Sequence, residues 1–92
     1  MAMKASIIAG IEFKVGPSMS YSLWKIGLTN NPEERKKHLR STEIQNVDRW
    51  SEWQANSLSE AEDIELHFLE KGMNGTPTRD LSRYKLAYVY IY

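Results

Sequence analysis

The chain contains no cysteine, only three prolines and five glycines, and its formal net charge is zero. Without cysteine it has no disulfide, no thiolate ligand for zinc and no cysteine nucleophile. Its longest run of apolar residues, at 86–92, spans seven residues, far fewer than the roughly 20 that a membrane-crossing helix requires. We therefore expect no membrane partner. The first residues lack the apolar segment of a secretory signal, which predicts a cytoplasmic protein.

The residues that are present are typical of one folded domain. The chain has 92 residues, of which 41% are hydrophobic and 26% charged, and this predicts a single domain over 1–92 with one modest core. The zero charge excludes a highly basic protein that coats DNA. However, residues 1–40 carry a net charge of +4, residues 41–70 carry −7 and residues 71–92 carry +3. This segregation indicates either a basic docking face beside an acidic helix or two solvated faces.

The first half of the chain predicts two strands and a helix. Apolar residues alternate with others over residues 7–15, the period of a half-buried strand, and a second strand is expected at about 21–28. The short turn between them favours an antiparallel hairpin. Asn31, Pro32 and Glu34 then occupy the cap, first and third positions of a helix that runs to about residue 40.

A longer helix is predicted from the capping serines near residue 57 to about residue 71. At 100° per residue its apolar stripe contains Leu58, Ala61, Ile64, Phe68 and Leu69. Glu65 lies inside that stripe. A carboxylate in a buried stripe is costly unless it is paired, bound to a metal or placed at the edge of a cleft.

The remaining pattern completes a small α+β domain. A weaker strand with Trp50 and Trp53 is expected at 47–54, a short helix at 80–84, and a last strand at 86–92. We expect the last strand to direct its alternate apolar residues to the core and its tyrosines to the other side. Three roles are open for these tyrosines: they stack bases, they form a dimer edge, or they lie under a helix. The predicted architecture is a β-β-α-β-α core with a C-terminal β-strand.

One segment carries more specific information. Residues 24–35 read Trp-Lys-Ile-Gly-Leu-Thr-Asn-Asn-Pro-Glu-Glu-Arg, a strand, a turn and a helix that bears an inward arginine. This segment resembles the second motif and the motif arginine of the GIY-YIG nuclease superfamily, in particular its phage-type branch. Arg35 follows Gly27 by eight positions, as in that family. The segment from Ala61 to Glu65 is similar to the family's Ala-x-x-(Leu/Ile)-Glu helix, and the resemblance covers about residues 9–70.

The resemblance implies a metal-dependent DNA endonuclease, and with it a phage or mobile-element origin. Arg35 is expected to stabilise the phosphate, for which a planar guanidinium is well suited. Glu65 is expected to bind Mg²⁺ or Mn²⁺, since Mg²⁺ takes one or two carboxylates and keeps its waters. An ion pair, with Glu65 itself as a partner of Arg35, is the structural alternative for both residues.

The chain departs from the family at two tyrosine positions. Where the first motif reads Gly-Ile-Tyr the chain has Glu12, and Lys25 replaces the tyrosine that commonly opens the second motif. The predicted hairpin makes Glu12 and Lys25 cross-strand neighbours, either as a base with its activating partner or as an inert ion pair. Tyr21 and His38 are further candidates to assist the attacking water.

Three more cations on the first predicted helix, Lys36, Lys37 and Arg40, are candidates for phosphate contacts that do not depend on base sequence. Recognition of a defined DNA site by so small a domain would require a homodimer or a partner. The two replaced tyrosines favour a second hypothesis, a catalytically inactive relative that binds nucleic acid or protein through the same cleft.

Overall fold

The computed structural model describes residues 3–42, 49–76 and 87–92. The elements in chain order are α1 (Lys4–Val15), the 3-10 helix η1 (Ser18–Leu23), β1 (Ile26–Thr29), α2 (Pro32–Thr42), β2 (Ser51–Gln54), α3 (Leu58–Glu70) and β3 (Tyr88–Ile91). The predicted α+β class is confirmed. Within the described ranges, no helix has the length and apolarity needed to cross a membrane.

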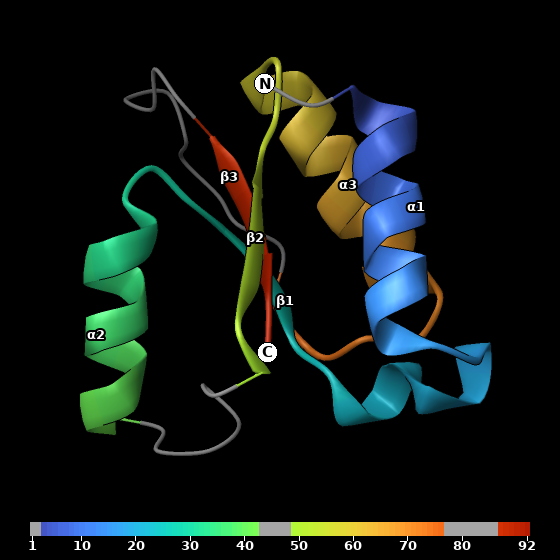
Figure 1. The fold of residues 1–92 in the computed structure, drawn as a ribbon, viewed down its shortest axis with the longest axis horizontal. Coiled ribbons are helices and arrows are strands. Elements are labelled where there is room, and N and C mark those ends of the chain that lie inside the picture. The colour runs from blue at the N-terminus through green and yellow to red at the C-terminus, as the bar shows by residue number, and fades with distance from the viewer. Residues whose placement is uncertain (1–2, 43–48, 77–86) are drawn as a thin grey trace.

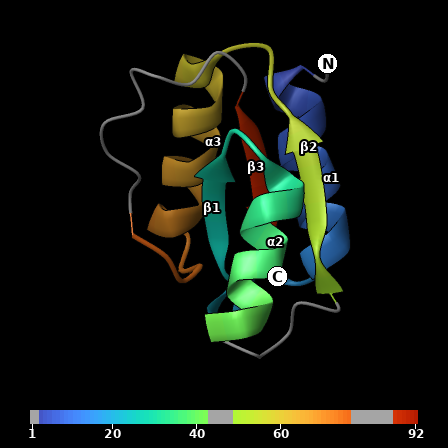
Figure 2. The same ribbon diagram turned by 90° about the vertical axis from the view of Figure 1, so that its left-hand side faces the viewer.

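The sheet is built around the last strand of the chain. β3 lies between β1 and β2 and is antiparallel to both. In this register Gly27 of β1 and Glu52 of β2 are both partners of Tyr90. Helices α1 and α3 cover one side of the sheet and α2 covers the other (Figures 1 and 2). The central strand therefore contributes side chains to two different helical layers.

Alternation along β3 separates two buried clusters. Ala87, Val89 and Ile91 belong to the larger cluster, together with the buried residues of α1 and α3. Tyr90 and Tyr92 belong to the smaller one, which also contains Leu39, and Trp50 packs against it. The predicted C-terminal strand and its two faces are thus confirmed. Burial of one large apolar side chain contributes about 1.5–3 kcal/mol to folding, so the larger cluster dominates stability.

The predicted strand at 7–15 is wrong, because these residues form α1. Ile7, Ile11 and Val15 are buried and lie four residues apart, as on one face of a helix, whereas Phe13 is 91% exposed. The apolar residues satisfied both the strand and the helix period, and packing against α3 selected the helix. The predicted hairpin is wrong as well. Residues 18–23 form η1, and β1 pairs with β3.

The two later helices are confirmed, together with their caps. The Asn31 side-chain oxygen accepts a hydrogen bond from the Glu34 backbone N–H at 3.2 Å at the start of α2. Ser57 Oγ accepts one from the Glu60 N–H at 3.1 Å at the start of α3. Each cap satisfies one of the unpaired N–H groups of a first helical turn. Of the strand predicted at 47–54, residues 51–54 form β2 and residues 49–50 are not in a strand. Residues 47–48 and the predicted short helix at 80–84 lie outside the described residues.

Candidate functional site

A cavity of about 600 Å³ lies between α2, β1 and the segment that follows α3. This volume lies within the range of roughly 300–1,000 Å³ that is usual for ligand sites. The residues that line it are Lys25, Ile26, Gly27, Leu28, Thr29, Asn30, Asn31, Glu34, Arg35, His38, Gly75, Thr76, Tyr90 and Tyr92. The cavity is therefore on the α2 side of the sheet, and its lining includes the segment that resembles the nuclease motif.

One of the two tyrosines that line this cavity, Tyr90, lies directly over a glycine. A Cβ atom placed on Gly27 would lie 2.5 Å from Cζ and 3.0 Å from Cε2 of Tyr90. No real Cβ approaches a ring this closely, so any residue other than glycine at this position would displace Tyr90. Gly27 thus allows the Tyr90 ring to cross β1 and reach α2.

The Tyr90 hydroxyl contacts the arginine of α2. Arg35 Nε donates a hydrogen bond to Tyr90 Oη at 3.0 Å, and Arg35 Cζ lies 6.0 Å from the centroid of the ring. Trp50 stacks on the same ring, with centroids 4.6 Å apart and planes 9° apart. Tyr90 is 4% exposed, whereas Arg35 is exposed. A buried, stacked ring therefore orients an accessible guanidinium group.

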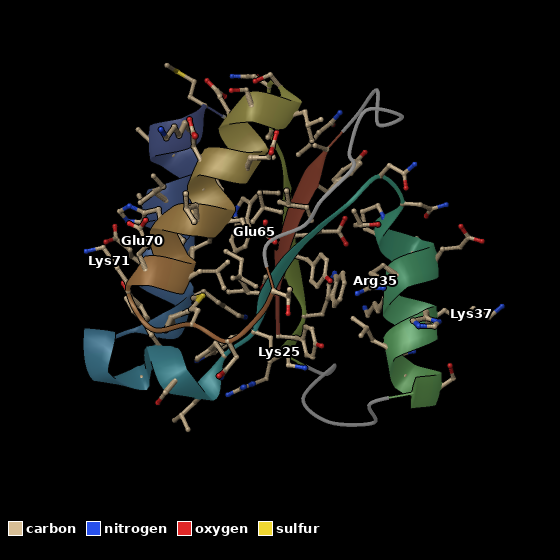
Figure 3. The ribbon with its side chains drawn as sticks, turned by 180° about the vertical axis from the view of Figure 1, so that it is seen from behind. Lys25, Arg35, Lys37, Glu65, Glu70 and Lys71 are labelled. Carbon is tan, nitrogen blue, oxygen red and sulfur yellow. The ribbon has the colours of Figure 1, made fainter. Side chains whose placement is uncertain are left out.

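Two further predicted site residues share this cavity. Lys25, the residue before β1, and His38, one turn after Arg35 on α2, both line it. Figure 3 shows Lys25 beside the sheet and Arg35 facing it from α2. Glu34 adds one carboxylate, which accepts a hydrogen bond from the Asn31 side-chain nitrogen at 3.3 Å. The structure thus brings together Lys25, Arg35 and His38, which the sequence placed in one site.

Glu12 and Tyr21 do not line this cavity. Glu12 is exposed on α1, on the other side of the sheet, so the prediction that it neighbours Lys25 across two strands is wrong. Tyr21 is 4% exposed and its ring meets that of Phe68 edge-on, with centroids 5.8 Å apart. Burial raises the pKa of the Tyr21 hydroxyl, and the negative charge of Glu12 raises it further. Tyr21 belongs to the core.

Glu65 is buried, as its place in the apolar stripe indicated, and is 3% exposed. Figure 3 shows it between α3 and the sheet, while Arg35 lies on the α2 side. Glu65 is not among the residues that line the Arg35 cavity. Among residues 3–42, 49–76 and 87–92, moreover, no three His, Asp or Glu side chains gather in a group that could hold a metal ion.

The other cations of α2 differ in their exposure to solvent. Lys37 and Arg40 are exposed and Lys36 is half-buried. Figure 3 shows Lys37 pointing away from the sheet, toward solvent. The exposed cations Lys37 and Arg40 can meet an anionic surface that approaches α2 from solvent.

Compared with models of protein families, with curated proteins and with solved structures, the chain matches none. The resemblance to a nuclease family therefore rests on the motif residues of the sequence alone. Tyr90 was not among the predicted site residues. The alternation of apolar residues and tyrosines in the last strand was the only sign in the sequence that Tyr90 lies on the face away from the larger cluster. Its pairing with Gly27, 63 positions earlier in the chain, is not visible in the local sequence.

Proposed function

We propose that the protein is a small DNA endonuclease of the GIY-YIG type, which binds a phosphodiester in the Arg35 cavity. The observation that carries this proposal is the hydrogen bond from Arg35 Nε to Tyr90 Oη at 3.0 Å. It lies in a cavity that also contains Lys25 and His38. The site thus combines a fixed guanidinium, a second cation and an imidazole side chain.

These side chains suit phosphodiester hydrolysis. A guanidinium held in place before the reaction stabilises the charge that develops on the phosphoryl oxygens, at little cost in reorganisation. Tyr90 supplies that fixation from within the sheet. Lys25 would add positive charge beside the phosphate, and His38 would accept a proton from the attacking water.

The position of Tyr90 supports the family resemblance in an unexpected way. The resemblance implies a tyrosine that faces the site from the first motif, and the chain has Glu12 there. In the structure β3 lies beside the Lys-Ile-Gly strand, and its Tyr90 faces Arg35. We therefore propose that the C-terminal strand provides the tyrosine that the first motif lacks.

The resemblance also implies Mg²⁺ or Mn²⁺ on Glu65. Mg²⁺ retains several waters when it is bound through one or two carboxylates, and a side chain that is 3% exposed leaves no space for them. As placed, Glu65 does not fit such an ion, and we assign no catalytic step to a metal. A requirement for Mg²⁺ or Mn²⁺ remains a prediction of the resemblance.

The position of Glu65 favours one second candidate function. A protein with the Arg35 cavity but no metal carboxylate beside it would bind DNA without cleaving it. The replacement of a motif tyrosine by Lys25 also favours a protein that binds DNA without cleaving it. A homodimer that reads a defined DNA site remains a prediction for either function.

A plasmid-nicking assay with Mg²⁺ or Mn²⁺ distinguishes the two functions. Removal of one preorganised charge-stabilising donor typically lowers the rate by about 10²–10³, and we expect this loss for Arg35→Gln. Tyr90→Phe keeps the ring on Gly27 and removes the acceptor of Arg35 Nε, so we expect a smaller loss of about tenfold. Lys71→Ala, at the end of α3, is the matched control and should nick like the wild type.

The other outcomes are equally informative. Absence of nicking by the wild type, together with DNA binding that Arg35→Gln weakens, would support the second function. DNA binding that is unchanged by Arg35→Gln would contradict both.

A further inference from the structure

We propose that a second copy of this chain pairs with the outer edge of β2, so that two three-stranded sheets join into one. The sheet order is β1-β3-β2, which makes β1 and β2 its two edges. An edge strand presents backbone N–H and C=O groups that pair readily with another strand. The residues of β2 and α1 that carry this inference do not line the Arg35 cavity, so the dimer and the proposed function can be tested separately.

The edge at β1 is already covered by the segment that follows α3. Asn74 forms a parallel bridge with Lys25. The Ile26 N–H donates a hydrogen bond to the Asn74 carbonyl at 3.0 Å, and the Asn74 N–H donates one to the Trp24 carbonyl at 2.9 Å. A second sheet therefore cannot be added along this part of β1.

The edge at β2 has no such cover in the described part of the chain, where no strand or bridge pairs with its outer side. Figure 2 shows β2 at the edge of the sheet, with α1 behind it and α3 on the side of β1. Two copies that meet edge to edge therefore meet through β2 of each. Such a contact uses the same surface twice and closes as a two-fold dimer, without growing into a filament.

The hydrogen bonds between β2 and β3 determine which groups of β2 face outward. The Ala55 N–H donates to the Ala87 carbonyl at 3.0 Å. Backbone groups alternate in an antiparallel ladder, so those of Trp53 also face β3. The backbone groups of Glu52 and Gln54 face the outer edge. When these two residues form the hydrogen-bonded pairs of a dimer, Glu52 of each copy lies opposite Gln54 of the other.

The side chains of β2 are complementary to themselves in this register. Glu52 is exposed and Gln54 is half-buried, and an amide can donate to a carboxylate across the pair. A register that set Glu52 opposite itself would place like charges together, which is destabilising. In the favoured register Trp53 lies opposite Trp53 of the second copy, on the two-fold axis. Aromatic pairs across strands are among the favourable ones.

Helix α1 adds an apolar side chain beside the same edge. A Cβ atom on Gly10 would lie 3.0 Å from Trp53 Nε1, so Gly10 marks the face of α1 that meets β2. At 100° per residue, Ser6 and Phe13 lie within about 60° of Gly10, on the side away from the buried Ile11. Phe13 is 91% exposed, the highest value among the large hydrophobic residues of the described part.

The two-fold axis explains this exposure. An axis at Trp53 passes beside Gly10, so α1 of the two copies run antiparallel and meet near that glycine. Phe13, one turn after Gly10, then lies opposite Ser6, one turn before Gly10 in the second copy. A large side chain is thus matched by a small one. The axis is perpendicular to the sheet, so both α2 helices and both Arg35 cavities lie on the same side of the dimer.

Sedimentation equilibrium over a series of concentrations tests this dimer with matched variants of the whole chain. Phe13→Ser removes the exposed ring from α1. Leu66→Ser is its control, because Leu66 is 49% exposed but belongs to α3, on the side of β1. Gln54→Lys and Gln54→Glu place opposite charges at one position of β2. Unfolding midpoints are compared first, so that only folded variants are assayed.

We expect the wild type to form a dimer that Phe13→Ser weakens by about tenfold or more, since each copy buries one phenyl ring. Leu66→Ser should leave the dissociation constant unchanged. Gln54→Lys should tighten the dimer by about fivefold and Gln54→Glu should weaken it by about as much. These opposite effects are expected because residue 54 faces the Glu52 carboxylate of the second copy, and the contact occurs twice.

A monomer at all concentrations up to about 1 mM, where even weak interfaces associate, would overturn the inference and leave this edge to a strand of another protein or to solvent. A dimer that Phe13→Ser and Leu66→Ser weaken equally would also overturn it. Equal dissociation constants for Gln54→Lys and Gln54→Glu would show that the two copies do not pair through β2. In each of these cases nicking and DNA binding by the Arg35 cavity would remain to be judged by Arg35→Gln.

Discussion

The ring of Tyr90 occupies the space that a Cβ atom would need on Gly27, its register partner on the adjacent strand. This contact brings the Tyr90 hydroxyl to Arg35 Nε, 55 residues away in the chain. A glycine and a tyrosine on paired strands therefore determine where the guanidinium of α2 is held.

The first prediction concerns this contact. A methyl group on Gly27 would force the Tyr90 ring away, and overpacking of this kind typically destabilises a protein by about 1–3 kcal/mol. We expect Gly27→Ala to lower the free energy of unfolding by that amount in urea denaturation. In a Tyr90→Ala background the same substitution should cost much less, because the ring is absent. An equal cost in both backgrounds would show that the two residues are not coupled.

A second prediction concerns the exposed cations of α2. If Lys37 meets phosphates, Lys37→Ala should weaken DNA binding to a similar extent for all sequences. It should also reduce the slope of log affinity against log salt concentration by about 1. Lys71→Ala is the matched control, because Figure 3 shows Lys71 at the end of α3, across the sheet from Lys37. Equal salt slopes for the two variants would contradict a role of the α2 surface.

A third prediction separates the structural role of Glu65 from a metal role. Because Glu65 is buried and lies on the α3 side of the sheet, we expect Glu65→Gln to lower the free energy of unfolding. The loss should be about 1–3 kcal/mol, as is usual when a buried polar group is altered. Affinity for DNA in the presence of EDTA should be unchanged.

The contrary outcome is well defined. If Glu65→Gln abolished nicking by a wild type that requires Mg²⁺, while stability and DNA affinity were retained, Glu65 would be the metal ligand that the family resemblance implies.

A fourth prediction follows from the raised pKa of Tyr21. The hydroxyl is neutral in both states below its ordinary pKa of 10.0. Above that value the unfolded chain releases the proton first, because the pKa of the folded protein is higher. Unfolding then becomes more favourable as pH rises toward the folded pKa. We expect the free energy of unfolding to fall above about pH 10, and to fall less steeply in Tyr21→Phe. Parallel curves for the two proteins would exclude a contribution from Tyr21.

The local parts of this fold could be predicted from the sequence. The caps at Asn31 and Ser57 lie beside the residues whose N–H groups they satisfy, so the starts of α2 and α3 were visible in short segments. The burial of Glu65 followed from helical periodicity alone. The two faces of the last strand followed from its alternation of apolar residues and tyrosines.

The order of strands could not be predicted in this way. Residues 7–15 satisfied both the strand and the helix period, and contacts of Ile7 and Ile11 with the rest of the larger cluster decided for a helix. Because the first segment is a helix, it does not pair with β1, and β3 lies between β1 and β2. Strand pairing depends on hydrogen bonds between distant residues, which local propensity does not encode.

By itself, the sequence determined a small α+β domain with Arg35 one turn into a capped helix and Glu65 on a buried face. Only the tertiary structure decided that Arg35 faces Tyr90 and that Glu65 lies across the sheet from the Arg35 cavity. The physical reason is that a helix dictates which residues share a face, whereas the packing of the whole chain dictates which layer that face meets.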